Sequence, residues 1–124
     1  MSSKPEIPKP SGKPPTKLVT KDIVVGKGRA AQAGDNVVVH YVGVLHRTGE
    51  QFDASWDAGS PFAFALGQGN VIAGWDQGVE GMKIGGRRLL TIPPDLAYGE
   101  QGQGSIGPNE TLVFVVDLLN VTPA

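Results

Sequence analysis

The chain has 124 residues, a formal net charge of −1 and an isoelectric point near 6.1. This length suits one domain with a single hydrophobic core. The near-neutral charge gives no general attraction to nucleic acid or to an acidic membrane. Cysteine is absent and histidine occurs twice. A disulfide framework, a thiol nucleophile, a cysteine-ligated zinc site and a three-histidine metal site are therefore excluded.

No apolar run approaches the ~20 residues that a membrane-spanning helix needs. The N-terminal lysines are not followed by the apolar stretch of a signal peptide. We therefore expect a cytoplasmic protein without a membrane or nucleic-acid partner, unless the chain is the processed form of an exported protein.

Residues 1–17 differ in composition from the rest of the chain. They contain Pro5, Pro8, Pro10, Pro14 and Pro15, and four lysines against one glutamate. Such a segment has too little apolar surface to fold alone, so residues 1–17 are predicted to be a disordered, solvated tail. A weak electrostatic tether to an acidic partner is the alternative. The folded domain is predicted over residues 18–124.

From residue 18 onwards, short β patterns alternate with turns that contain glycine. In the β-branched run after residue 36, period-2 alternation places Val37, Val39 and Tyr41 on one face and His40 and Val42 on the other. A long glycine-rich loop over 97–109 precedes the last pattern. Strands are predicted at residues 18–25, 37–45, 51–54, 62–66, 87–92 and 112–121.

One amphipathic helix is predicted between these strands, at residues 71–81. Asn70 suits the N-cap position and Gly81 suits a left-handed stop. Gly74 and Gly78 each cost about 1 kcal/mol relative to alanine inside a helix, so the surrounding structure must hold the helix in place. The apolar arc of the helical wheel consists of Ile72, Trp75, Val79 and Met82.

Six strands and one helix predict an α+β fold with a mainly antiparallel sheet. One face of that sheet must be covered, and residues 71–81 are the only amphipathic helix available. A strongly curved sheet could wrap around this short helix, and the helix glycines would let the two approach closely.

Two motifs suggest chemistry that their context does not support. Residues 102–107 match a GxGxxG pattern, but Pro108 and a strand follow instead of a helix N-terminus, so no nucleotide site is predicted. Asp53 and Asp57 are four residues apart and could be read as an acid/base carboxylate pair. Turn or surface aspartates are the favoured interpretation.

The histidines and aromatic residues remain as candidate functional groups. His40 and His46 have no convincing Ser or Asp partner in the sequence, so solvated roles are favoured over catalysis. Six aromatic residues on separate elements could form either an ordinary core or a half-open pocket. Composition favours the core, whereas the polar tips of Tyr and Trp favour the pocket. These residues are Tyr41, Phe52, Phe62, Trp75, Tyr98 and Phe114.

From about Leu18 to the C-terminus, the sequence resembles the FKBP-type peptidyl-prolyl cis–trans isomerases. Each matching fragment is weak alone, but together they occur in the family's order with near-family spacing. The fragments are Val38-Val39-His40-Tyr41-Val42-Gly43, Phe52-Asp53-Ala54-Ser55, Pro61-Phe62, Leu66-Gly67, Val71-Ile72-Ala73-Gly74-Trp75-Asp76, Leu90-Thr91-Ile92-Pro93, Ala97-Tyr98-Gly99 and Thr111-Leu112-Val113-Phe114.

The resemblance implies a curved antiparallel sheet around one short helix, with a substrate pocket between them. Trp75 would form the pocket floor, Asp53 and Tyr98 would be its polar groups, and Ile106 would cover it from the loop. The Ile72 backbone N–H would donate to a bound carbonyl. Asp53, Tyr98 and Phe114 are the implied catalytic residues, and Tyr41, Phe52, Phe62, Val71, Ile72, Trp75 and Ile106 the implied substrate-binding residues.

The resemblance further implies an isomerase that accelerates rotation about X–Pro bonds and assists protein folding, without a cofactor or metal. The aromatic pocket would stabilise a twisted amide non-covalently. The implied partners are proline-containing segments of client proteins and macrolide inhibitors of the rapamycin/tacrolimus type. We expect a monomer. The alternative is a proline-binding or chaperone-like module with little turnover.

Two departures from the family bear on these expectations. Larger chaperone-type relatives carry an inserted domain between the positions of Tyr98 and Phe114, where this chain has only a short loop, slightly shorter than in the best-known small members. Ala58 stands where those members have a basic residue able to pair with the aspartate at the Asp53 position. Asp53 is therefore expected to be less restrained, and inhibitor affinity and substrate preference are left open.

Overall fold

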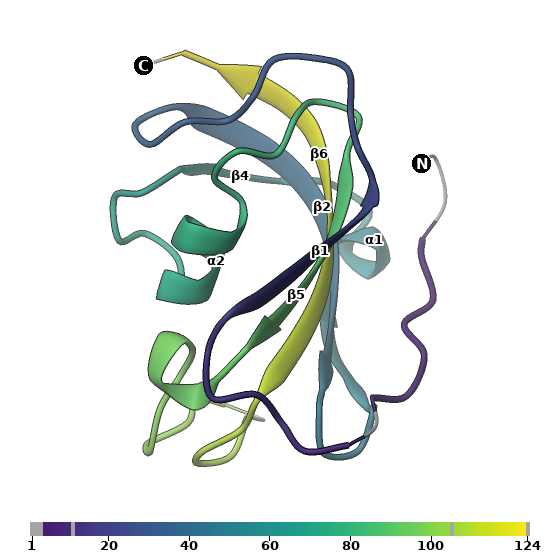
Figure 1. The fold of residues 1–124 in the computed structure, drawn as a ribbon, viewed down its shortest axis with the longest axis vertical. Coiled ribbons are helices and arrows are strands. Elements are labelled where there is room, and N and C mark those ends of the chain that lie inside the picture. Colours follow the sequence, from purple (N-terminus) through teal and green to yellow (C-terminus); the bar gives the residue numbers. More distant parts are fainter. Residues whose placement is uncertain (1–3, 11, 105, 124) are drawn as a thin grey trace.

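The computed structural model describes residues 4–10, 12–104 and 106–123. Six strands form one antiparallel sheet that curves around a short helix, α2 (Figure 1). Strands β1, β5, β6, β2 and β3 are neighbours in that order, and β4 also pairs with β2. The strands are β1 (Val19–Val24), β2 (Asn36–Leu45), β3 (Gln51–Ala54), β4 (Phe62–Ala65), β5 (Arg87–Ile92) and β6 (Leu112–Thr122).

Three short helical segments connect the strands: α1 (Ser55–Ala58), α2 (Ala73–Gly78) and the 3₁₀ turn η1 (Pro94–Leu96). The sequence predicted α2 but neither α1 nor η1. Within the described residues, no helix has both the length and the apolar character needed to cross a membrane.

Alternation along β2 divides the sheet into two faces with different cores. Val37 and Val39 point to the α2 side and pack into the main core with Trp75. Val42 and Val44 belong to a separate apolar cluster, which lies on the opposite side of the strand because successive side chains alternate. We call the α2 side the inner face and the opposite side the outer face.

Helix α2 is shorter than predicted, and it begins later. Ile72 is the N-cap residue and has an extended conformation, so the predicted cap Asn70 lies outside the helix. The predicted left-handed conformation of Gly81 is present, with a φ of 88°, but the C-cap residue is Val79. The correction matters because it leaves the backbone before Ala73 free to form part of a pocket wall.

The glycines of α2 let the helix lie directly on β5. A Cβ atom at Gly74 would be 2.5 Å from the Cγ2 atom of Ile92, and one at Gly78 would be 2.9 Å from a methyl group of Leu90. These two positions are therefore close-packing sites, as the sequence predicted.

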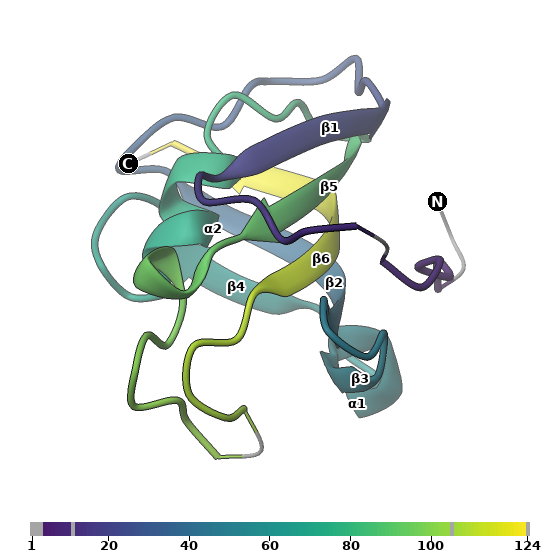
Figure 2. The ribbon, with the colours of Figure 1, turned by 60° about the horizontal axis from the view of Figure 1, so that its bottom comes forward.

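The outer face is partly covered by α1 and by the N-terminal segment 4–10. Both lie on the side of the sheet away from α2 (Figure 1; Figure 2 shows the same arrangement from below). The segment contains no helix or strand. However, Ile7 packs against the outer apolar cluster and Lys4 forms an ion pair with Asp57. The prediction of a solvated tail did not include these contacts.

Candidate active site between the sheet and helix α2

A cavity of about 200 Å³ opens between the inner face of the sheet and the start of α2. It collects residues from β2, β3, β4, β6, the segment around α2 and the loop after η1. All of the residues predicted to form the pocket line it except Ile106, and Asn70 is an addition. The lining residues are Tyr41, Phe52, Asp53, Phe62, Asn70, Val71, Ile72, Trp75, Tyr98 and Phe114.

Trp75 forms the buried base of this cavity. It lies in the first turn of α2 and is 4% exposed. The rings of Tyr41 and Phe114 meet it nearly at right angles, with centroid distances of 4.9 and 5.3 Å. Edge-to-face contacts of this kind favour one relative orientation of the rings. The rings of the floor therefore support one another in this orientation.

The Phe52–Phe114 wall depends on a glycine in the middle of β2. The two rings pack edge to face at 5.5 Å. A Cβ atom at Gly43 would be 2.7 Å from both rings, so only glycine at this position lets them meet over the strand. Phe62 forms the open side of the cavity and is 41% exposed.

The polar rim of the cavity is built on a short hydrogen bond. The Tyr41 hydroxyl donates to Asp53 Oδ2 at 2.6 Å. Burial raises the pKa of Tyr41 well above its usual value, and the hydrogen bond to Asp53 and the charge of that carboxylate raise it further. The Tyr41 hydroxyl therefore stays protonated at neutral pH and continues to donate to Asp53.

Within the described residues, Tyr41 is the one hydrogen-bond partner of the Asp53 side chain. It is exposed at the rim and has no cationic partner among the ion pairs of the described residues. Ala58, in α1, offers no charge at the position where a basic residue was expected from the family. The restraint on Asp53 that the structure shows is the hydrogen bond from the Tyr41 hydroxyl.

Tyr98 supplies a hydroxyl that is available to a ligand. Burial raises its pKa, and the negative charge of Asp53 adds to this effect. The hydroxyl has no hydrogen-bond partner in the part of the chain that the structure describes. Tyr98 is thus a protonated donor at the edge of an apolar cavity.

Ile106 does not cover the pocket as predicted. It is 8% exposed, packs in the main core and exchanges two backbone hydrogen bonds of 2.9 Å with Gln103. Its buried side chain anchors the second half of the loop to the main core. Asn70, which the sequence predicted only as a helix cap, also lines the cavity. Its position directly before Val71, a predicted pocket residue, could have indicated this.

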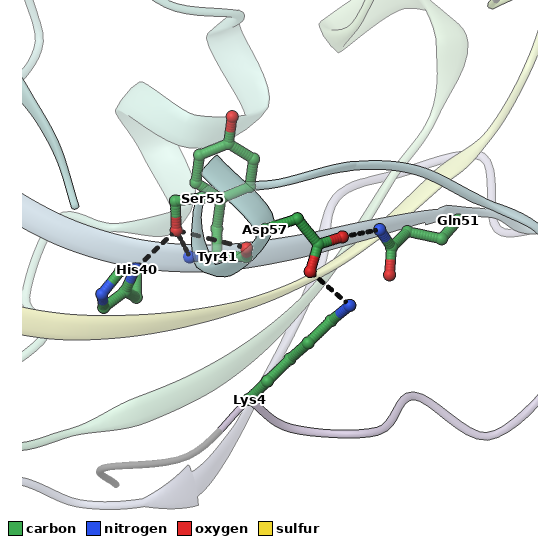
Figure 3. Close-up of polar contacts among 6 residues, drawn as sticks. All are labelled: Lys4, His40, Tyr41, Gln51, Ser55 and Asp57. Carbon is green, nitrogen blue, oxygen red and sulfur yellow. Dashed lines mark hydrogen bonds and ion pairs between the residues drawn. The ribbon is translucent and has the colours of Figure 1, made fainter. Parts of the chain in front are cut away.

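The segment after Asp53 ties the pocket to the outer face. The Tyr41 backbone N–H donates to Ser55 Oγ at 2.7 Å, and His40 Nδ1 lies 2.8 Å from the same oxygen (Figure 3). The His40 ring also stacks on Trp56, with a centroid distance of 4.1 Å. The expectation that His40 is simply solvated, without a serine partner, is therefore wrong.

Asp53 and Asp57 do not form a catalytic pair. Asp57 bonds instead to Lys4 and Gln51, at 2.9 and 2.7 Å, as a surface residue (Figure 3). Across the described ranges, no group of three or more His, Asp or Glu residues is placed to hold a metal ion.

Comparison with known proteins identifies the fold and the family. Residues 27–119 match the FKBP-type peptidyl-prolyl cis-trans isomerase family. The chain belongs to this family. It is 60% identical over 120 residues to the FK506-binding protein of Streptomyces anulatus, covering 95% of this chain and 97% of that protein. It is 52% identical over 117 residues to the probable FK506-binding protein of Corynebacterium glutamicum, covering 94% and 98% of the two chains.

Two solved structures share the fold. FkpA from Escherichia coli superposes with a TM-score of 0.80 at 48% identity, over 86% of this chain and 49% of FkpA. AtFKBP13 superposes with a TM-score of 0.77 at 42% identity, over 83% of this chain and 91% of that chain. The predicted fold class is confirmed, and this FKBP is a peptidyl-prolyl cis–trans isomerase. Every residue that lines the cavity lies within the matched range, whereas segment 4–10 lies outside it.

Proposed function

We propose that the cavity binds exposed X–Pro segments of client proteins and isomerises them by stabilising a twisted amide non-covalently, so that client folding is assisted. The observation that carries this proposal is the cavity's composition. Its floor and walls are aromatic, and two polar groups, the Asp53 carboxylate and the Tyr98 hydroxyl, stand at its edge.

This reaction requires the protein to supply only a small amount of preferential binding energy. Rotation about the X–Pro bond crosses a barrier of ~18–20 kcal/mol, and no covalent bond forms or breaks. Each tenfold acceleration needs only about 1.4 kcal/mol of preferential binding to the transition state. A planar amide owes its stiffness to charge separation that water stabilises. An aromatic cavity removes that water and so favours the less polar, twisted amide.

In this proposal, each part of the site has its own role. The proline ring rests on Trp75 and against Phe114. The Ile72 N–H precedes the first turn of α2 and has no hydrogen-bond partner in the described part of the chain, so it can donate to a substrate carbonyl. Tyr98 holds a second carbonyl, and the Asp53 carboxylate sets the electric field near the rotating one.

Exchange NMR on a prolyl tetrapeptide tests this proposal. Catalytic amounts of the protein should accelerate cis–trans exchange, and an equimolar amount of rapamycin should suppress the acceleration. A proline-binding module with little turnover would shift the peptide resonances and leave the exchange rate unchanged. That second result would contradict the isomerase mechanism while preserving the binding site.

The same proposal covers inhibitors and cellular context. The relatives from Streptomyces and Corynebacterium are named FK506-binding proteins, which supports macrolide binding in the aromatic cavity of this chain. We propose that rapamycin and tacrolimus compete with prolyl peptides there. That the protein is cytoplasmic and monomeric stays a prediction. Sedimentation at increasing protein concentration tests the monomeric state.

A further inference from the structure

A second hollow lies on the outer face, on the opposite side of β2 and β3 from the active site. Its volume is about 440 Å³, and it lies between the N-terminal segment and the two strands. The segment therefore lies over a groove that it does not fill. We call this hollow the outer groove. Its lining residues are Lys4, Pro5, Glu6, Ile7, Val42, Val44, Gly49 and Gln51.

Beside the outer groove, Lys4 of the N-terminal segment forms an ion pair with Asp57. Lys4 Nζ donates to Asp57 Oδ1 at 2.9 Å, and Gln51 Nε2 donates to the other carboxylate oxygen at 2.7 Å (Figure 3). Gln51 belongs to β3, so the sheet itself orients the carboxylate. The hydrogen bonds from Lys4 and Gln51 also hold the pKa of Asp57 below its usual value. The carboxylate is thus charged and directed at the bound segment.

The middle of the outer groove binds an aliphatic side chain. Ile7 packs against the cluster of Val42, Val44, Ala54 and Val113, which Trp56 borders. Stacking on His40 fixes the Trp56 ring. The Trp56 Nε1–H is buried and lacks a hydrogen-bond partner among the described residues.

The spacing of the two bound side chains fits an extended, proline-rich peptide. Such peptides favour the polyproline II conformation, with three residues per turn, so positions i and i+3 lie on the same side. Lys4 and Ile7 have this spacing, and prolines stand at positions 5 and 8. A preformed extended segment also loses little conformational entropy on binding.

The cis occupant is held weakly by its own contacts. Lys4 and Asp57 are 38% and 54% exposed, and ion pairs at such exposure contribute about 0–1 kcal/mol. Covalent attachment raises the local concentration of the segment to roughly millimolar, and this tethering keeps it in place. A segment from another protein with better complementarity can therefore displace it.

We propose that the outer groove is a second peptide-binding site, for extended segments of a client protein that carry a lysine and, three residues later, a branched aliphatic side chain flanked by prolines. Residues 4–10 occupy it in cis and compete with the client. The site is separate from the aromatic cavity and needs no isomerisation. A client bound in the groove stays attached while its prolyl bonds visit the opposite face.

The full-length double variant K4E/I7D tests this site, because it releases the segment while leaving the sheet intact. The probe is the capped peptide Lys-Pro-Glu-Ile-Pro-Lys-Pro, followed by NMR of the Trp56 indole N–H and the Val42 amide. The peptide should shift both resonances saturably in the variant and bind the wild type at least tenfold more weakly. A control peptide with Asp in place of Ile should also lose at least tenfold in affinity.

Three results would overturn the proposal. The released variant could show no shift at millimolar peptide, or both peptides could bind both proteins equally, and the groove would then only pack the chain's own segment. Concentration-dependent dimerisation of the wild type that the double variant abolishes would assign the groove to a second copy. The milder variant I7A must also bind the peptide more tightly than the wild type does. This control separates release of the segment from damage to the fold.

Discussion

The two faces of strand β2 differ in how their side chains pack: one lines an open cavity, and the other is a covered apolar cluster. On the inner face, Tyr41 joins rigid, edge-to-face rings that leave a hollow open to solvent. On the outer face, Val42 and Val44 form an aliphatic cluster that the chain's own N-terminal segment covers. Aromatic rings fixed by one another cannot collapse into the space between them, whereas an aliphatic surface gains most by being covered. Strand alternation alone separates a catalytic cavity from a packing surface.

The largest loss of stability is expected from breaking the ion pair of Arg87 and Asp117 on the outer face. Asp117 is 1% exposed, and Arg87 donates to both its oxygens at 2.6 and 2.8 Å. Arg87→Met leaves a buried carboxylate unpaired, so the free energy of unfolding in urea should fall by about 3–5 kcal/mol. The double variant Arg87→Met/Asp117→Leu should recover most of it. A loss below about 1 kcal/mol in the single variant would show that the pair is not structural.

The next effect concerns the contact between α2 and the inner face. Gly74→Ala should destabilise the fold by about 1–3 kcal/mol, because the new methyl group meets three atoms of Ile92, despite the better helix propensity of alanine. The Gly78→Ala control should cost less, since it meets the ends of the flexible Leu90 side chain. Thermal unfolding of the two variants measures this order. Equal losses of stability would mean that the close approach of α2 to Ile92 does not determine the cost of an added methyl group.

A smaller effect separates catalysis from folding on the inner face. Tyr98→Phe removes only a hydroxyl that has no partner among the described residues. The value of kcat/KM on a prolyl peptide should fall about tenfold, which corresponds to the loss of one hydrogen bond in the transition state. The free energy of unfolding should change by less than about 0.5 kcal/mol. An unchanged kcat/KM would remove Tyr98 from the site.

The smallest effect is a pH dependence of stability to which the two tyrosines of the cavity contribute. The pKa values of Tyr41 and Tyr98 are raised in the folded protein. Folding therefore favours the protonated phenols, and their stabilising contribution is complete below the unfolded pKa of about 10 and is lost as the pH rises above it. Unfolding followed from pH 8 to 11 should show this decline, and Tyr98→Phe should make it shallower. A flat profile would contradict the raised pKa values.

The sequence predicted the regular parts of the molecule because their boundaries are marked locally. Strands β3 and β5 cover 51–54 and 87–92 as predicted. In β5, the prolines at 93 and 94 cannot continue a ladder, which places the end of the strand. The α+β class followed from the strand patterns and the single helix, whereas most of the pocket followed from motif order, since the resemblance to FKBPs located the aromatic residues.

The remaining features depend on tertiary contacts that local patterns do not record. Helical periodicity included Ile72 in the helix, but its φ of −59° and ψ of 148° are not helical, and it is the N-cap residue. The resemblance to FKBPs placed Ile106 over the pocket, whereas its side chain is buried in the main core and does not line the cavity. The docking of Ile7 was missed because composition reports whether a segment folds alone, not whether a sheet offers it a groove.

The most direct test of the central claim compares two exposed aspartates by the kcat/KM of a prolyl tetrapeptide. The Tyr41 hydroxyl holds the Asp53 carboxylate at the cavity rim, whereas Asp95, in η1, does not line the cavity. Asp53→Ala should lower kcat/KM by about tenfold or more with no change in the urea midpoint, and Asp95→Ala should leave both unchanged. Wild-type turnover in Asp53→Ala would contradict the account, because the rim carboxylate would then have only a structural role.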